Sequence, residues 1–293
     1  YIYFLLRWFH FLAGITWIGI LYYFNFIQTP FFGTALGGEA KSAMTRGLLP
    51  NALWWFRWGA MFTFATGLLI ILMKLGHDHM PLSSGYMTLI LTGGLLGTLM
   101  WANVWFVIWP AQQVVIRSAE QVAGGGQAIP EAAARGARAG LASRTNTLFS
   151  IPMLFFMGSA RHMTPGFNDG SNDGIYWGLV LAVIAALELN ALMGTAPGRQ
   201  KYLTTVSGTI HVGLAATLVL FLIGAIVNRL ARRPPCKPEA RSGRTARMHT
   251  ARIAHAARPR CSLIAMEYPP RSVELNEDGS ADDVTAHEDR WTV

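Results

Sequence analysis

The stretch LLRWFHFLAGITWIGILYYF, from Leu5 to Phe24, decides the class of this protein. It is long and apolar enough to cross a bilayer, because about 20 mostly apolar residues in a helix cover roughly 30 Å of hydrocarbon. It nevertheless carries Arg7 and His10, which are three positions apart and therefore share one helical face. The segment is too long and too polar at these positions for a secretory signal peptide. We expect a membrane-spanning helix that holds two polar groups.

The rest of the chain has the same apolar character. Of its 293 residues, 52% are hydrophobic and only 14% are charged, and ten are tryptophan. This balance lies outside the usual range of soluble domains. The apolar runs predict an all-α integral membrane protein, a bundle of about six transmembrane helices. The expected spans are Ile2–Ile27, Ala52–Leu75, Tyr86–Pro110, Thr147–Ala160, Ile175–Met193 and Thr205–Val227.

The fourth expected span is short and contains Pro152. Inside a membrane, the carbonyl that a proline leaves without its helical donor must be satisfied by a neighbouring helix. Two arrangements fit this segment. It is either a spanning helix with such a neighbour, or a segment that enters the membrane and returns on the same side.

Lysine and arginine in short loops collect on the cytoplasmic side of a membrane. The loops after the first, third and fifth spans hold most of them, whereas those after the second and fourth hold only Lys74 and Arg161. We therefore expect the first set to be cytoplasmic and both termini to lie outside a bacterial inner membrane. Arg229, Arg232 and Arg233, directly after the last span, argue for the opposite orientation. The residues of the expected cytoplasmic set are Lys41, Arg46, Arg117, Arg135, Arg138, Arg144, Arg199 and Lys201.

Residues 232–293 differ from the membrane domain expected at 1–231. They are basic at first and acidic toward the end, with almost no apolar periodicity, which predicts a disordered tail. Cys236 and Cys261, the two cysteines of the chain, lie there without a C-x-x-C-H or zinc-ligand pattern. A solvated tail explains the basic part most simply, so we expect membrane lipid but no nucleic acid as a partner.

The histidine of the first span predicts a haem. Ionisable groups at membrane depth cost about 2.5–3.5 kcal/mol and usually have a function. Imidazole ligates haem iron in helical bundles, and Gly14, one turn from His10, would leave room for a porphyrin. We predict that His10 ligates haem b and that Arg7 pairs with a propionate. The second ligand stays open between His211, at a different depth, and His162, at a more similar depth. The alternative is that His10 and Arg7 only fix helix packing.

Four strings in the chain resemble a known family. They are LLRWFHFLAGITWIGILYYFNF, ALWWFRWGAMFTFATG, WANVWFVIWPAQQ and LASRTNTLFSIPMLFFMG. In this order they look like the membrane domain of the bacterial membrane-bound, cytochrome c-linked urate oxidase (urate hydroxylase) family, over most of residues 1–230. The resemblance implies oxidation of urate to 5-hydroxyisourate, with electrons passed to a c-type cytochrome rather than to oxygen.

The end of the chain departs from that family. Full-length members continue into a cytochrome c with a C-x-x-C-H motif, and residues 232–293 contain none. A frameshift in a GC-rich gene and a separate cytochrome subunit both explain this difference, and in the second case the c-type haem belongs to a partner. The alternative function is a non-catalytic haem b membrane subunit that relays electrons or anchors a respiratory complex. A transporter or a purely structural membrane protein fits the histidines less well.

Urate is a planar anion with alternating N–H and C=O groups along its edges. A site for it needs an arginine, an amide or backbone partner, and an aromatic face. Several residues of the chain offer such groups, although packing or anchoring at the membrane interface explains each of them as well. No catalytic residue is assigned. The candidate substrate-binding residues are Arg57, Asn103, Arg144 and Asn146.

Overall fold

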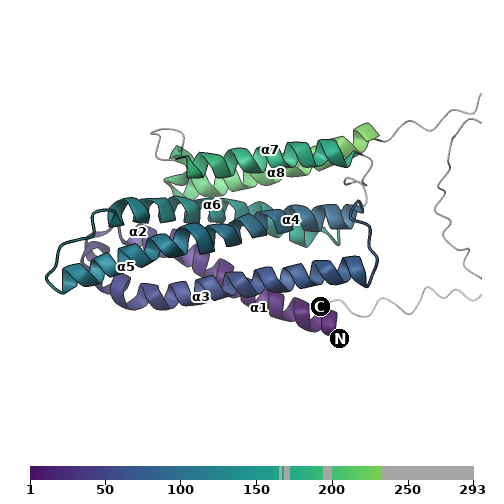
Figure 1. Cartoon of the computed structure of the whole chain (residues 1–293). Coiled ribbons are helices and arrows are strands. Elements are labelled where there is room, and N and C mark those ends of the chain that lie inside the picture. The colour runs from purple at the N-terminus through teal and green to yellow at the C-terminus, as the bar shows by residue number, and fades with distance from the viewer. Residues whose placement is uncertain (165–166, 168–171, 194–199, 232–293) are drawn as a thin grey trace, which may run out of the picture. The chain divides into compact units, whose positions relative to one another are not determined.

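A computed structural model of the chain describes residues 1–164, 167, 172–193 and 200–231. The expected tail with its two cysteines, and Arg199, lie outside these residues. The described part is helical and forms three layers (Figure 1). One outer layer holds α1 (Ile2–Tyr22) and α3 (Ala35–Gly76), the middle layer holds α4 (Gly85–Ala102), α5 (Trp109–Ala123) and α6 (Ala132–Ser159), and the other outer layer holds α7 (Asp173–Leu192) and α8 (Val206–Ala231).

Five helical runs of the described part are long and apolar enough to cross a membrane. They are Ile2–Phe31, Ala35–Gly76, Gly85–Ala123, Asp173–Leu192 and Val206–Leu230, and α6 adds a sixth long helix. The prediction of an all-α, multi-pass membrane protein is confirmed. Five of the six expected spans lie in these runs, because each run contains a stretch close to the length that a bilayer requires.

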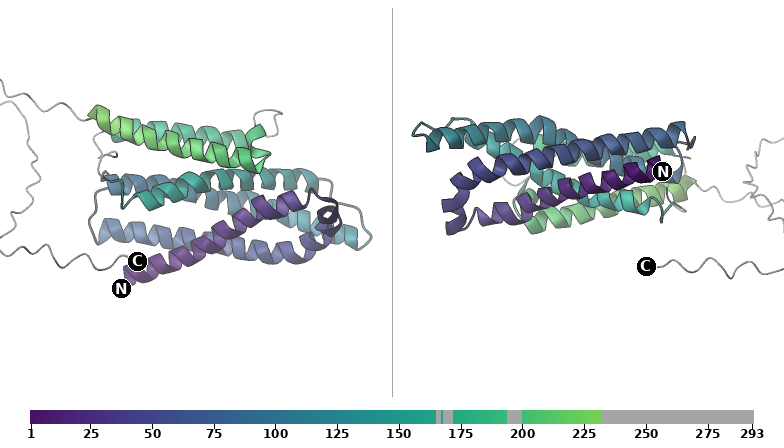
Figure 2. Two further views of the ribbon diagram at one scale, coloured as in Figure 1. Left: turned by 180° about the vertical axis from the view of Figure 1, so that it is seen from behind. Right: turned by 90° about the horizontal axis from the view of Figure 1, so that it is seen from below.

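Two of the runs are about twice as long as a bilayer is thick. α3 has 42 residues and the run Gly85–Ala123 has 39, so each extends for about 60 Å. In contrast, α7 has 20 residues and spans about 30 Å. The long runs continue past α7 at the end of the bundle where α5 connects to α6 (Figure 1). Figure 2 shows α1 crossing the bundle obliquely toward that same end. We call it the basic end, because Lys41, Arg117 and Arg138 lie there.

α6 is one continuous helix with Pro152 inside it, so the alternative of a segment that enters the membrane and returns is wrong. The helix also begins well before the predicted span, at Ala132, because its alanine-rich first turns favour helix without being strongly apolar. Gly213 of α8 packs closely against the turn of α6 that precedes the proline. A Cβ there would lie 3.0 Å from the carbonyl oxygen of Leu148, the group that Pro152 deprives of its donor.

Two π-helical turns interrupt the long runs. They are η1 (Tyr23–Gln28), which leads into α2 (Thr29–Phe31), and η2 (Asn103–Ile108), which joins α4 to α5. Each is followed two residues later by a proline, Pro30 or Pro110. Proline lacks an N–H and its ring displaces the carbonyl four residues before it, which accounts for the wider turn at this point. π-Turns are frequent at functional sites.

Candidate functional site

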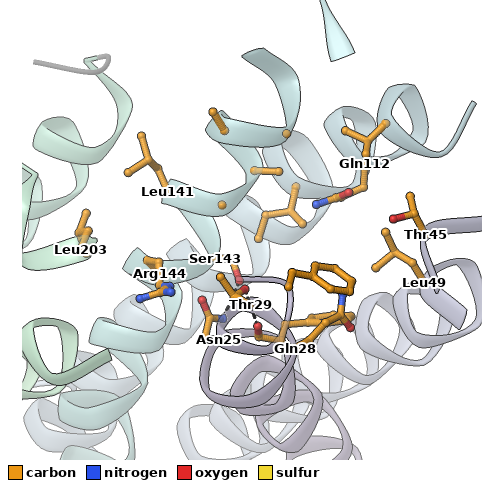
Figure 3. Close-up of a pocket in the computed structure, with 18 of the residues that line it drawn as sticks. Asn25, Gln28, Thr29, Thr45, Leu49, Gln112, Leu141, Ser143, Arg144 and Leu203 are labelled. Atoms are coloured by element: carbon orange, nitrogen blue, oxygen red, sulfur yellow. Dashed lines mark hydrogen bonds between the residues drawn. The ribbon is translucent and has the colours of Figure 1, made fainter. Parts of the chain in front are cut away.

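A cavity of about 950 Å³ lies at the basic end of the bundle (Figure 3). Its wall is formed by η1, α2, α3, η2, α5, α6 and the short 3-10 helix η3 (Lys201–Leu203). Its volume is near the upper end of the range of small-molecule sites. Both π-turns contribute to the wall, η1 through Asn25 and Gln28 and η2 through Ile108. The cavity is therefore the feature of the described fold that is best suited to hold a ligand.

The space exists because the first turns of α6 carry only small residues toward it. Ala133, Gly136, Ala137 and Gly140 lie in the wall. A Cβ added to Gly140 would meet nothing within 4 Å. The alanine- and glycine-rich composition of this segment thus keeps α6 helical and leaves the volume open.

The charged residues of the wall are all basic. Lys41, Arg144 and Lys201 line the cavity, and no aspartate or glutamate is found among its described lining residues. Charges of a single sign in a concave site raise the local concentration of the opposite ion. The cavity is therefore electrostatically suited to an anion.

Arg144 is the most informative of these residues. It is half-buried, and its Nη1 atom is buried without a hydrogen-bond partner in the described part of the chain. Burial lowers the pKa of Arg144, but an arginine stays protonated at neutral pH. A buried cation without a carboxylate is costly, and an anion in the cavity would remove that cost. Figure 3 shows Arg144 beside Ser143 and Asn25.

Amide side chains supply the polar part of the wall. The Nδ2 atom of Asn25 donates to the backbone oxygen of Leu21 and to Oγ of Ser143, both at 2.8 Å. These two bonds fix the orientation of the amide and leave its oxygen as an acceptor. Gln28 and Gln112 also line the cavity and carry both a donor and an acceptor.

An aromatic surface completes the wall. Phe24, Phe32 and Phe56 line the cavity, and the rings of Phe24 and Phe56 pack edge to face with their centroids 5.6 Å apart. The wall thus combines a half-buried guanidinium, several amides and flat apolar rings. This set can bind a planar anion whose edges both donate and accept hydrogen bonds.

The structure places only one of the four predicted substrate-binding residues in this wall, and that residue is Arg144. Asn103 and Asn146 are buried against each other, with Nδ2 of Asn103 donating to Oδ1 of Asn146 at 3.0 Å. Asn146 also donates to the backbone oxygen of Met100 at 2.9 Å. These amides tie α6 to the π-turn η2. Arg57 stacks on tryptophan rings outside the cavity.

His10 lies against α3. Its Nδ1 atom is 3.0 Å from Oγ1 of Thr66, and a Cβ on Gly67 would lie 3.1 Å from its Cε1 atom. Thr63 borders the space beside Gly14 that was expected to receive a porphyrin, because a Cβ on Gly14 would lie 3.8 Å from Cγ2 of Thr63. α3 therefore occupies the positions around His10 that a flat macrocycle on this side would need.

No second imidazole accompanies His10 in the described part of the chain. His211 is exposed on α8, where its Nδ1 atom is 2.7 Å from the backbone oxygen of Ser207, and His162 is exposed just after α6. Arg7 is half-buried one turn from His10. These residues do not fit a haem b held between two histidines. Haem b stays a prediction, and no step below depends on it. The described residues also contain no cluster of three or more potential metal ligands.

Sequence reasoning missed most of the wall. Asn25, Gln28, Gln112, Lys41 and Lys201 were not predicted as site residues. A usable signal was present, because Gln28 and Gln112 each lie two residues from a proline that follows a span. A polar residue beside a proline within a long helix indicates an irregular turn that faces protein rather than lipid.

The fold and the cavity define a polytopic helical membrane protein with a basic, amide-lined chamber at one end. Residues 75–220 match the family model described as urate oxidase N-terminal, so this segment belongs to the urate oxidase N-terminal family. The resemblance to the membrane domain of membrane-bound urate oxidases is confirmed. The matched segment includes Arg144 and extends from the end of α3 into α8. No curated protein and no solved structure matches the chain.

Proposed function

We propose that the chain is the membrane part of a urate-oxidising enzyme, which binds the urate anion in the cavity and passes electrons to a c-type cytochrome. One observation carries this proposal. Arg144 lies in the segment that matches the urate oxidase N-terminal model, and its buried Nη1 atom has no partner in the described chain, at the wall of a cavity without described acidic residues.

The chemistry of the wall supports urate as the ligand. The guanidinium of Arg144 presents parallel N–H donors to an anionic edge, and Lys41 adds positive charge. The amides of Asn25 and Gln112 match the alternating N–H and C=O groups of the purine edge. The ring of Phe56 offers an apolar face to the planar ring system.

The reaction sets clear limits on the chain's part in it. Conversion of urate to 5-hydroxyisourate adds one molecule of water and releases two protons and two electrons. Each c-type haem accepts one electron, so two molecules of the partner cytochrome are reduced for each urate. The residues of this chain bind the anion and hold it in one orientation. The water and the released protons exchange with the aqueous phase at the basic end.

The position of the cavity supports entry of urate from water. α7 is about as long as the bilayer is thick, and α3 and α5 continue past it at this end (Figure 1). This end of the bundle therefore reaches into the aqueous phase. The cavity wall includes Lys41 and Thr45 from this extended part of α3. The excess of basic residues predicts that this side is cytoplasmic.

Substitution of Arg144 tests the proposal. Arg144→Gln removes the charge while keeping an amide, and we expect urate to bind about 10- to 100-fold more weakly, because charge-assisted hydrogen bonds are worth about 1.5–3 kcal/mol. Arg138→Gln is the matched control, since Arg138 is exposed on the same helix and does not line the cavity. Equilibrium binding of urate to the purified full chain in detergent measures the affinity. Reduction of added c-type cytochrome measures turnover.

Two results would contradict the proposal. One is that Arg144→Gln binds urate as tightly as the wild type, and the other is that the wild-type chain binds no urate. An optical difference spectrum distinguishes the alternative function. A b-type signal that depends on His10 and does not respond to urate would favour an electron-relay subunit.

A further inference from the structure

Arg57 lies within a group of tryptophans outside the cavity. Its guanidinium carbon is 3.9 Å from the ring centroid of Trp109, 5.2 Å from that of Trp105 and 5.9 Å from that of Trp58. The rings of Trp58 and Trp105 pack edge to face at 5.7 Å. We call these three tryptophans the aromatic cage. A cation–π contact of this kind forms no hydrogen bond, so it does not satisfy the N–H donors of the guanidinium.

The cage contains donors without matching acceptors. No hydrogen bond or ion pair joins Arg57 to another described residue, and its Nε atom is buried without a partner. The indole Nε1 of Trp105 is likewise buried and unpartnered within the described chain. A partly buried cation without a carboxylate partner is costly, and acceptor oxygens from a molecule outside the chain would reduce this cost.

The depth of Arg57 indicates where these oxygens come from. About 26 Å of helix separates Arg57 from Lys74, the next charged residue along α3, which is close to the thickness of the hydrocarbon core. Trp54 and Trp55, immediately before Arg57, are 49% and 58% exposed on the outside of the helix. Exposed tryptophans gather at the level of the lipid headgroups. Arg57 therefore lies at the membrane surface on the side of the basic end.

We propose that Arg57 and the aromatic cage bind the phosphate group of an anionic phospholipid. The stacked guanidinium directs its edge donors to the phosphate oxygens, and the tryptophan rings pack against the upper part of the acyl chains. An anionic headgroup is favoured over a zwitterionic one because Arg57 carries a positive charge that is paired with no carboxylate among the described residues. This site does not depend on the proposed function.

Native mass spectrometry of the full chain, released from neutral detergent with added phosphatidylglycerol, tests the site. The wild type is expected to keep a bound phosphatidylglycerol that phosphatidylcholine does not replace at equal concentration. Arg57→Gln is expected to bind this lipid about tenfold more weakly, through loss of a charge-assisted contact. Arg46→Gln is the control, because Arg46 is exposed on α3 outside the cage, and its binding should equal that of the wild type.

Several outcomes would overturn the site. They are equal retention of phosphatidylglycerol by Arg57→Gln and the wild type, equal binding of phosphatidylcholine, and occupation by inorganic phosphate offered in place of lipid. If Arg57→Gln does not fold, Arg57→Lys decides. It keeps the charge but cannot stack flat on Trp109, so binding should fall several-fold, and unchanged binding would refute the cage.

Discussion

Glycines lie both at the close-packed interfaces of the bundle and in the wall of the cavity, but they act differently in the two regions. Between α1 and α3, a Cβ on Gly59 would lie 3.2 Å from the backbone nitrogen of Trp17. Between α4 and α6, a Cβ on Gly93 would lie 3.0 Å from Met157, whereas one on Gly140 in the cavity wall would meet nothing within 4 Å. The facing element makes the difference. Where another helix lies directly opposite, a small residue allows the two helices to pack closely. Where the opposite helix is farther away, a small residue leaves an open cavity.

Enlarging a small residue at a closed interface has the largest expected effect. At Gly213 a Cβ would lie 2.5 Å from Cδ1 of Ile151 and 3.0 Å from the oxygen of Leu148. We expect Gly213→Leu to lower the free energy of unfolding by about 3 kcal/mol or to prevent folding, because α8 must move away from α6. Thermal unfolding in detergent measures the loss. Gly178→Leu is the control, since Gly178 is exposed and a Cβ there meets nothing within 4 Å. Equal stability of the two variants would remove the distinction between closed and open positions.

The same change in the cavity wall should leave the fold intact and affect the ligand. Gly140→Leu places a side chain in the open space, and we expect urate affinity to fall about tenfold while stability rises by about 0.5–1 kcal/mol, because leucine favours helix over glycine. Gly38→Leu on α3 is matched to it, since a Cβ there also meets nothing within 4 Å but Gly38 does not line the cavity. Urate binding that survives in Gly140→Leu would place the site elsewhere.

Hydropathy predicts the spans better than it predicts the partners of polar residues. The predicted span Ile175–Met193 agrees with α7 (Asp173–Leu192) to within two residues at its start, because this helix is apolar and about as long as the bilayer is thick. α6 begins at Ala132, far before its predicted span, since its outer turns are helical through alanine rather than through apolar periodicity. A search for runs that fit a membrane does not detect such turns.

The candidate site was predictable only in part for a similar reason. Arg144 was identified from its residue type, because a site for a planar anion needs an arginine. The hydrogen-bond contact of His10 could not be predicted, since it involves Thr66, a residue of another helix. Whether Asn146 faces the cavity or another amide is likewise set by how α6 is rotated against η2, which one sequence does not contain.

The hydrogen bond between η1 and α6 at the cavity is expected to have a smaller effect on stability, which a double-mutant cycle can isolate. Nδ2 of Asn25 donates to Oγ of Ser143 at 2.8 Å. We expect Asn25→Ala to cost about 1–2 kcal/mol and the coupling of Asn25→Ala with Ser143→Ala to be about 1 kcal/mol. Thermal unfolding of the two single variants and the double variant in detergent measures it. If the losses of stability in the two single variants simply add in the double variant, this hydrogen bond does not stabilise the basic end of the bundle.

The smallest effect is expected at the end of the bundle opposite the cavity, where charges are paired. Asp78 accepts hydrogen bonds from Lys74 and His77, and the first of these is the main reason why its pKa is lowered to about 2. The unfolded chain has a pKa of about 3.9 at this carboxyl, so the pair stabilises the fold above about pH 4 and loses its effect as the pH falls toward 2. Asp78→Asn should therefore lower the apparent unfolding temperature slightly at neutral pH, and its difference from the wild type should vanish near pH 2. A difference that stays constant or grows on acidification would show that the lowered pKa of Asp78 is not coupled to folding. The paired end and the cavity, whose described charged lining residues are all basic, would then not differ in how their charges affect the stability of the fold.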